Sequence, residues 1–145
     1  MQKVGLDELL ERSDLISVHC PLTNETYHLL STREFNLMKD GVFIVNTSRG
    51  PIIDESALVE ALRSGKVWGV GLDMLEHESL PLDSPLRDCG NVTLTPHVGA
   101  SSEESTNDLY RAGCQIIVGV YNGRWPKSVV NPEVITTTPY TYRRD

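Results

Sequence analysis

Four short apolar runs, separated by segments with helical spacing, constrain the fold of this chain more than any other feature. Strands that alternate with helices of about ten residues indicate parallel β-α-β units. The second run is apolar at almost every position, which is typical of a strand buried on both faces. The four predicted strands are 14–19, 41–46, 66–73 and 91–96. We therefore expect an α/β fold built on a parallel sheet.

Capping residues predict where the helices begin and end. Residues 6–12 are expected to form a short helix, and Ser31 with Glu34 has the spacing of a capping box. Asp54 is expected to cap the next helix, which Gly65 should end in the left-handed conformation. The apolar side chains expected on one face of that helix are Ala57, Leu58, Ala61 and Leu62.

A longer helix is predicted near the end of the chain. Ser101 and Glu104 have the spacing of a second capping box, and the apolar pattern beyond them indicates a helix over about 101–121. We expect residues 1–132 to form one domain portion. Residues 133–145 lack periodicity and are expected to form a C-terminal tail.

Composition excludes several classes of function. The net charge of −7 argues against a nucleic-acid partner, since phosphate binding needs a basic face. No apolar run approaches the roughly 20 residues of a membrane span, and the start of the chain has no secretory apolar segment. The three cysteines have spacings that fit neither a zinc site nor a disulfide framework, so no metal is expected. The chain is therefore expected to be intracellular and cytoplasmic.

Unusual side chains follow each of the four predicted strands. Ligands of open parallel sheets bind beyond the carboxyl ends of the strands, so these residues should share one edge. Each has a plain structural reading by itself: Arg49 as a solvated charge, His97 as a structural histidine, and the acidic stretch 73–78 as an exposed turn. Together they provide a guanidinium, carboxylates and an imidazole, a set suited to acid–base chemistry on an anionic substrate.

Two segments carry a resemblance to a known family. "VNTSRGPIIDESALVEALRSGKVWGVGLDMLEHE" and "NVTLTPHVGAS" resemble the D-isomer-specific 2-hydroxyacid dehydrogenases, which include phosphoglycerate, glycerate and glyoxylate/hydroxypyruvate dehydrogenases. The resemblance covers about residues 5–132. It implies a Rossmann-like, doubly wound parallel sheet in three α-β-α layers, and an oxidoreductase that uses NAD, with NADP left open.

The resemblance also implies roles for individual residues. By this match, Arg49 binds the carboxylate and carbonyl of the substrate, and His97 is the general acid/base. Glu78 pairs with His97, with Glu76 as the alternative partner. Asp73 is implied to hold the nicotinamide carboxamide. The further cofactor contacts implied by the match are Cys20, Pro21, Thr47, Ser48, Arg49, His97, Gly99 and Ala100.

The chemistry of these side chains suits the implied reaction. Reduction of a 2-oxo acid adds a hydride to carbon and a proton to oxygen, and a histidine with a pKa near 6.5 can provide that proton. A carboxylate beside the histidine favours the charged imidazole. The planar guanidinium of arginine matches a carboxylate at two points, which lysine does not reproduce.

The sequence departs from the family in one main respect. It has no G-x-G-x-x-G turn after a strand, and no acidic residue 20 or so positions later to hold the adenosine ribose. The first βαβ unit and the substrate domain are thus expected to be missing, leaving the C-terminal part of an NAD-binding domain that is inactive alone. The helix over about 101–121 should then expose apolar surface.

The expected partners follow from the same resemblance. The substrate is a small 2-oxo or 2-hydroxy acid, and the full-length parent is expected to be a homodimer. The alternative is an NAD-linked corepressor-type binding protein of the same fold, which would recruit peptides rather than turn over a substrate.

Overall fold

The computed structural model describes residues 2–77 and 80–136. The chain divides into two compact units, residues 1–99 and residues 100–145. The expected boundary between a domain portion and a tail at 132/133 stays a prediction, because most of that tail lies outside the described residues.

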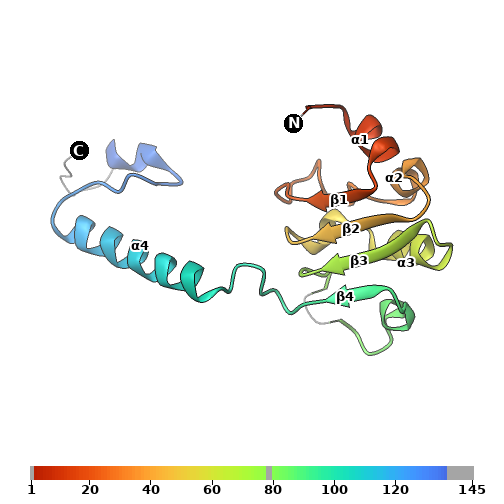
Figure 1. Ribbon diagram of the computed structural model, residues 1–145. Helices are drawn as coiled ribbons and strands as arrows, with labels where there is room; N and C mark the ends of the chain where they lie inside the picture. Colours follow the sequence, from red (N-terminus) through yellow and green to blue (C-terminus); the bar gives the residue numbers. More distant parts are fainter. Residues whose placement is uncertain (1, 78–79, 137–145) are drawn as a thin grey trace. The chain divides into compact units, whose positions relative to one another are not determined.

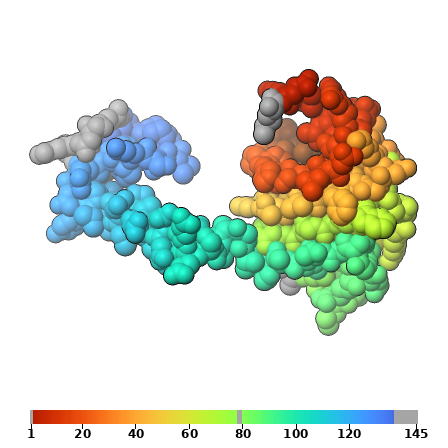
Figure 2. Space-filling view, viewed as in Figure 1, coloured from red at the N-terminus to blue at the C-terminus, as the bar shows by residue number. Residues whose placement is uncertain are grey.

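The first unit is built on a parallel sheet whose strands lie in chain order. Figure 1 shows them side by side, and Figure 2 shows the corresponding colours as successive bands of one packed body. Residues Ile16, Ile44 and Val70 are in register across three strands and share one face. The strands are β1 (Leu15–Val18), β2 (Val42–Asn46), β3 (Val67–Leu72) and β4 (Val92–Leu94). The predicted parallel α/β fold is therefore confirmed.

The helices of the first unit begin and end at the predicted residues. Glu34 accepts a hydrogen bond from the Ser31 N–H at 3.3 Å, and Asp54 accepts one from the Ala57 N–H at 3.2 Å. Gly65 has φ +77°, the left-handed conformation expected at a helix end. The helices are α1 (Leu6–Arg12), α2 (Thr32–Leu37) and α3 (Glu55–Arg63), with 3-10 turns at Gly50–Ile52 and Pro85–Asp88.

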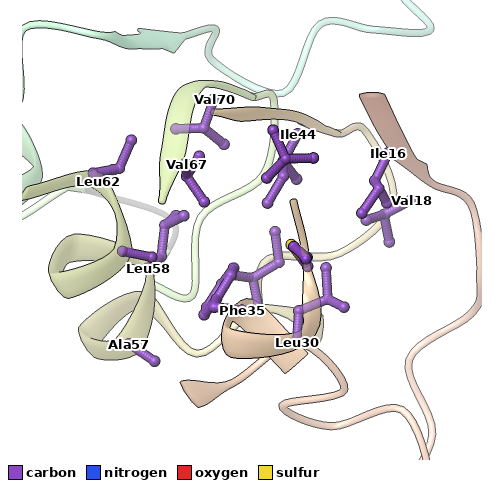
Figure 3. Packing of buried hydrophobic residues seen from close by; sticks show 14 of the residues in the cluster. Ile16, Val18, Leu30, Phe35, Ile44, Ala57, Leu58, Leu62, Val67 and Val70 are labelled. Atoms are coloured by element: carbon purple, nitrogen blue, oxygen red, sulfur yellow. The ribbon is translucent and has the colours of Figure 1, made fainter. Parts of the chain in front are cut away.

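One hydrophobic core joins these helices to one face of the sheet (Figure 3). Phe35 of α2 and Leu58 of α3 are almost wholly buried, as is Ile44 of β2. Burying a side chain of this size stabilises the fold by about 1.5–3 kcal/mol. The core therefore fixes the carboxyl ends of the strands relative to one another, which is what a site at that edge requires.

The opposite face of the sheet carries no helix from the described part of the first unit. Leu15, Phe43 and Trp68 are 45–64% exposed there. The register of β2 and β3 shifts between Val42 and Phe43, which makes Trp68 an extra residue between paired positions. This surface, defined by Leu15, Phe43 and Trp68, is called the bare face below.

The second unit contains α4 (Glu103–Tyr121) and the 3-10 turn Pro132–Thr136. Ser102 caps α4 by accepting a hydrogen bond from the Ser105 N–H at 3.0 Å. The predicted capping box of Ser101 and Glu104 is therefore wrong by one residue: three positions after Ser102 stands a serine, not a glutamate.

Apolar side chains on α4 are exposed, as expected. The helix buries none of its residues, and Leu109, Ile117 and Tyr121 are at least 71% exposed. No helix in the described residues has the length and apolar character needed to cross a bilayer.

Candidate active site

Asn46 organises the turn that follows β2. Its side chain is fully buried, donates a hydrogen bond to the Arg49 carbonyl at 2.9 Å and accepts one from the Ser48 N–H at 3.0 Å. These bonds satisfy both ends of the amide and fold residues 46–49 into a fixed turn. Sequence reasoning missed this residue. The pattern that could have indicated it is a polar residue at the end of an apolar strand, at a position that alternates onto the same buried face as Val42 and Ile44.

Ser48 joins the ends of β1 and β2. Its hydroxyl donates to the Val18 carbonyl at 2.7 Å, and the exposed Arg49 follows it directly. One guanidinium nitrogen donates to the Ser48 carbonyl at 2.6 Å, and Arg49 makes no ion pair with a carboxylate among the described residues. An open depression of about 490 Å³ lies here, lined by His19, Cys20, Pro21, Leu22, Ser48 and Arg49.

Gly50 brings the loop after β2 against the loop after β3. It is buried, and a Cβ added to it would lie 1.8 Å from the Leu75 carbonyl oxygen. No side chain can stand between two backbones this close. The glycine beside Arg49 is therefore required by contact between the loops.

Asp73 organises the loop after β4. Its side chain is 7% exposed and accepts hydrogen bonds from the Thr95 hydroxyl, from the Val98 N–H at 2.9 Å and from the Gly99 N–H at 2.8 Å. These bonds, the Thr95 hydroxyl foremost, hold the pKa of Asp73 below its usual value. The loop is thus wrapped around an ionised carboxylate.

His97 sits at the centre of that loop in an uncommon backbone conformation. Its φ is +55°, and its N–H lies within hydrogen-bond distance of the Asp73 carbonyl at 3.1 Å and the Thr95 carbonyl at 3.0 Å. A left-handed conformation at a residue other than glycine costs about 1–3 kcal/mol and persists only when the surroundings determine it. An open depression of about 410 Å³ includes Asp73, Thr95 and His97 in its lining.

The expected site residues fall into two neighbouring groups. Cys20, Pro21, Ser48 and Arg49 line the first depression, and Asp73 and His97 line the second. Thr47 links the groups, because a Cβ on Gly99 would lie 3.9 Å from the Thr47 Cβ.

Three expected contacts need separate comment. Glu78 lies outside the described residues, and Ala100 belongs to the second unit. The carboxylate of Glu76, the alternative partner of His97, contacts other groups in the structure. One oxygen of the Glu76 carboxylate lies 2.9 Å from His28 Nε2, and the other accepts the Glu55 N–H at 3.4 Å.

A family comparison decides what these groups belong to. The sequence model described as "D-isomer specific 2-hydroxyacid dehydrogenase, NAD binding domain" matches residues 1–99. The chain belongs to the D-isomer-specific 2-hydroxyacid dehydrogenase family. Members of this family are oxidoreductases, and the matched region is their NAD-binding domain.

The curated relatives that the chain matches are longer proteins. A glyoxylate reductase of Thermofilum pendens is 40% identical over 139 residues, which are 96% of this chain and 41% of that protein. A glyoxylate/hydroxypyruvate reductase B of Escherichia coli O17:K52:H18 is 39% identical over 129 residues, 89% of this chain and 40% of the relative. The chain thus spans about two fifths of the curated relatives it matches.

Solved D-2-hydroxyacid dehydrogenases share the fold. An NAD-complexed enzyme from Lactobacillus delbrueckii ssp. bulgaricus has a TM-score of 0.81 and 27% identity, over 88% of this chain and 43% of that one. A D-lactate dehydrogenase of Aquifex aeolicus, complexed with NAD and lactic acid, has a TM-score of 0.76 and 33% identity, over 83% and 40% of the two chains.

The donor and acceptor pattern of Asp73 fits a nicotinamide. An ionised carboxylate has about four acceptor positions, and its bonds to Thr95, Val98 and Gly99 use three of them. One position remains for a ligand that donates an N–H. The carboxamide of a nicotinamide carries such a donor, so the chemistry of this loop is compatible with that group.

Proposed function

We propose that the complete protein containing this chain interconverts a small 2-oxo acid and the corresponding D-2-hydroxy acid with NAD(H). The chain contributes the C-terminal part of the NAD-binding domain. One observation carries this proposal: the guanidinium of Arg49 follows β2 and the imidazole of His97 follows β4, two strands of one parallel sheet that are separated by β3 and end at the same edge.

In this proposal Arg49 binds the substrate. Its backbone is held by Asn46, while the remaining guanidinium N–H groups are available to a ligand. A planar fork of donors suits the carboxylate of a 2-oxo acid in two-point contact, and a further N–H can polarise the carbonyl oxygen.

His97 is the proposed general acid/base. It gives a proton to the carbonyl oxygen during reduction and takes it back during oxidation. The bound nicotinamide supplies or accepts the hydride. Glu78 is the proposed partner of His97, supported by its place five residues after Asp73 and by the engagement of Glu76 with His28.

The proposed cofactor contacts surround these two groups. Asp73 holds the nicotinamide carboxamide through its remaining acceptor position. The other proposed contacts are Cys20, Pro21, Thr47, Ser48, Arg49, His97, Gly99 and Ala100. The depression beside Arg49 supports the contacts of Cys20, Pro21, Ser48 and Arg49, and the close approach of Thr47 to Gly99 supports the contacts of those two residues.

We further propose that the 145-residue chain transfers no hydride by itself and that the complete protein is a homodimer. The sequence carries no G-x-G-x-x-G turn to bind the pyrophosphate at a helix start. Calorimetry with NADH should detect only weak binding to the chain alone. Tight binding would contradict this part of the proposal.

Loss of NADH absorbance in the presence of glyoxylate, hydroxypyruvate or phosphohydroxypyruvate tests the activity of the complete protein. At least one of these acids should be reduced, and His97→Ala should lower kcat by about 10²–10⁴-fold. The matched control is His77→Ala, because His77 is an exposed histidine. A wild-type protein that reduces none of these acids would overturn the proposed activity. A His97→Ala variant with an unchanged rate would overturn the proposed acid/base.

A further inference from the structure

His28 lies in the loop between β1 and α2 and has a constrained conformation. Its φ is +51°, its N–H donates to the Pro51 carbonyl at 2.8 Å, and its ring stacks on Tyr27 with centroids 4.1 Å apart. Among the residues that the structure describes, only His28 and His97 combine a side chain with a positive φ. Such a conformation is held by its surroundings.

Glu76 is what holds the ring of His28. Its Oε1 lies 2.9 Å from His28 Nε2, and its Oε2 accepts the Glu55 N–H. The Glu76 N–H in turn donates to the Glu55 carboxylate. The side chains of His28 and Glu76 are 29% and 21% exposed, so water competes weakly for these bonds.

We propose that His28 and Glu76 are positioning residues, whose hydrogen-bonded contact ties the loop after β1 to the loop after β3 and so holds Asp73 and His97 in place. This inference rests on the proposed function, because it concerns the geometry of that same site. We call the His28–Glu76 contact the loop tie.

The chemistry of the loop tie places a proton on one nitrogen of the histidine ring. An ionised carboxylate can only accept, so Nε2 carries the proton that is donated to Glu76. The Nδ1 atom then faces Asp54 Oδ2 at 3.9 Å. Asp54 is itself engaged by the Ser31 hydroxyl at 2.8 Å and by the Ala57 N–H. The titratable groups around the ring are therefore Asp54 and Glu76, with Tyr27 stacked on its face.

The loop tie connects segments that carry the proposed site. Glu76 lies three residues after Asp73 and directly after Leu75, whose carbonyl packs on Gly50. Arg49 directly precedes Gly50 in the chain, so this contact lies beside the proposed substrate-binding residue. Loss of the His28 contact therefore leaves Glu76 held through Glu55 and loosens the segment that sets the distance between the loops after β2 and β3. A misplacement of 1 Å at a reacting centre can lower a rate by about 10²-fold.

Amide hydrogen exchange in the 145-residue chain tests the loop tie without any activity. His28→Ala should speed exchange at Val98 and Gly99, which donate to Asp73, by about tenfold relative to β2 amides that report global unfolding. His28→Gln should restore slow exchange, because its amide can donate to Glu76. His77→Ala, an exposed histidine, is the matched control. Unchanged relative exchange in His28→Ala would overturn the proposal.

Kinetics of the complete protein provide the second test. His28→Ala should lower kcat by about 10²-fold while KM for NADH changes less than about threefold, and His28→Gln should recover most of the rate. The losses of His28→Ala and Glu76→Ala should not add in the double variant, because both substitutions remove the same Nε2–Oε1 contact, while Glu76→Ala also removes the bond to the Glu55 N–H. Additive losses, or a wild-type kcat in His28→Ala, would overturn the positioning role. Absence of reductase activity in the wild type would overturn the proposed function instead, and the exchange experiment would still decide whether the tie holds the loop.

Discussion

Asp73 and Gly99 are 26 residues apart in the chain, and the Gly99 N–H donates to the Asp73 carboxylate at 2.8 Å. The contact leaves no room for a larger residue, because a Cβ on Gly99 would lie 2.9 Å from the same oxygen. Together with the bonds from Thr95 and Val98, it closes the loop around His97. One carboxylate therefore determines where the proposed acid/base lies.

Asp73→Asn should destabilise the loop around His97. An asparagine keeps one acceptor oxygen but turns the other position into a donor, which then faces an N–H or hydroxyl that also donates. We expect a lower unfolding temperature by circular dichroism and, in the complete protein, a kcat lower by about 10²-fold. Asp88→Asn, at an exposed position, is the control and should match the wild type. Equal behaviour of the two variants would contradict the role of Asp73.

The stability of the fold should depend on pH through Asp73. Its folded pKa is held below the ordinary value of 3.8, mainly by the Thr95 hydroxyl, so its stabilisation is present above that value. The stabilisation is lost as the pH falls below 3.8 through the lowered folded pKa. Urea midpoints of wild type and Asp73→Asn should therefore differ at pH 6 and converge in acid. A difference that stays constant across that range would refute this assignment.

Gly50→Ala should be strongly destabilising. The added methyl would meet the Leu75 backbone at 1.8 Å, and neither backbone segment can withdraw without disturbing the strands behind it. We expect a loss of about 3 kcal/mol in the free energy of unfolding, measured with urea. Gly90→Ala is the matched control, because a Cβ there has no heavy atom within 4 Å. A comparable effect of both substitutions would show that the close approach is not responsible.

Asn46→Ala should loosen the turn that carries Arg49. The substitution empties a buried position, leaves the Ser48 N–H without its partner and leaves the Arg49 carbonyl with the Ile52 N–H at 3.4 Å as its remaining donor. The expected loss is about 1–3 kcal/mol of unfolding free energy, together with a higher KM for the 2-oxo acid. Asn36→Ala, on the exposed surface of α2, should change neither quantity appreciably. If Asn46→Ala kept the wild-type free energy of unfolding and KM, the turn would not be what holds Arg49 in place.

Arg49→Lys should separate charge from geometry at the proposed substrate site. Lysine keeps the positive charge but cannot contact a carboxylate at two points. In the complete protein we expect kcat/KM for the 2-oxo acid to fall about 10–100-fold, while NADH affinity changes little. Arg63→Lys, at an exposed position near the end of α3, is the control for replacing an arginine by a lysine. Full activity of Arg49→Lys would exclude a two-point contact.

Local signals were sufficient to predict most of the first unit. The apolar run at 41–46 and the capping residues Asp54 and Gly65 act through neighbours close in the chain, and each prediction agrees with the structure. The cap of α4 was misplaced because two adjacent serines offer the same chemistry. Only the hydrogen bond from Ser105 distinguishes Ser102 from Ser101.

The contacts that assemble the candidate site depend on distant segments instead. Strand ends predicted that Arg49 and His97 would share an edge, because parallel strands deliver their carboxyl ends together. The tie between His28 and Glu76 spans 48 residues, and nothing in either local sequence indicates the other. The sequence spacing of the acidic residues 73–78 likewise could not show that the Glu76 carboxylate contacts His28.

The bare face of the sheet can be followed by tryptophan fluorescence. Trp68, one of two tryptophans in the sequence, stands at the register shift with 64% of its surface exposed. An indole in water emits at longer wavelength than one in an apolar environment. A Trp125→Phe chain excited at the red edge of the indole band would therefore report through a single tryptophan, and any covering of the bare face would shift its emission to the blue.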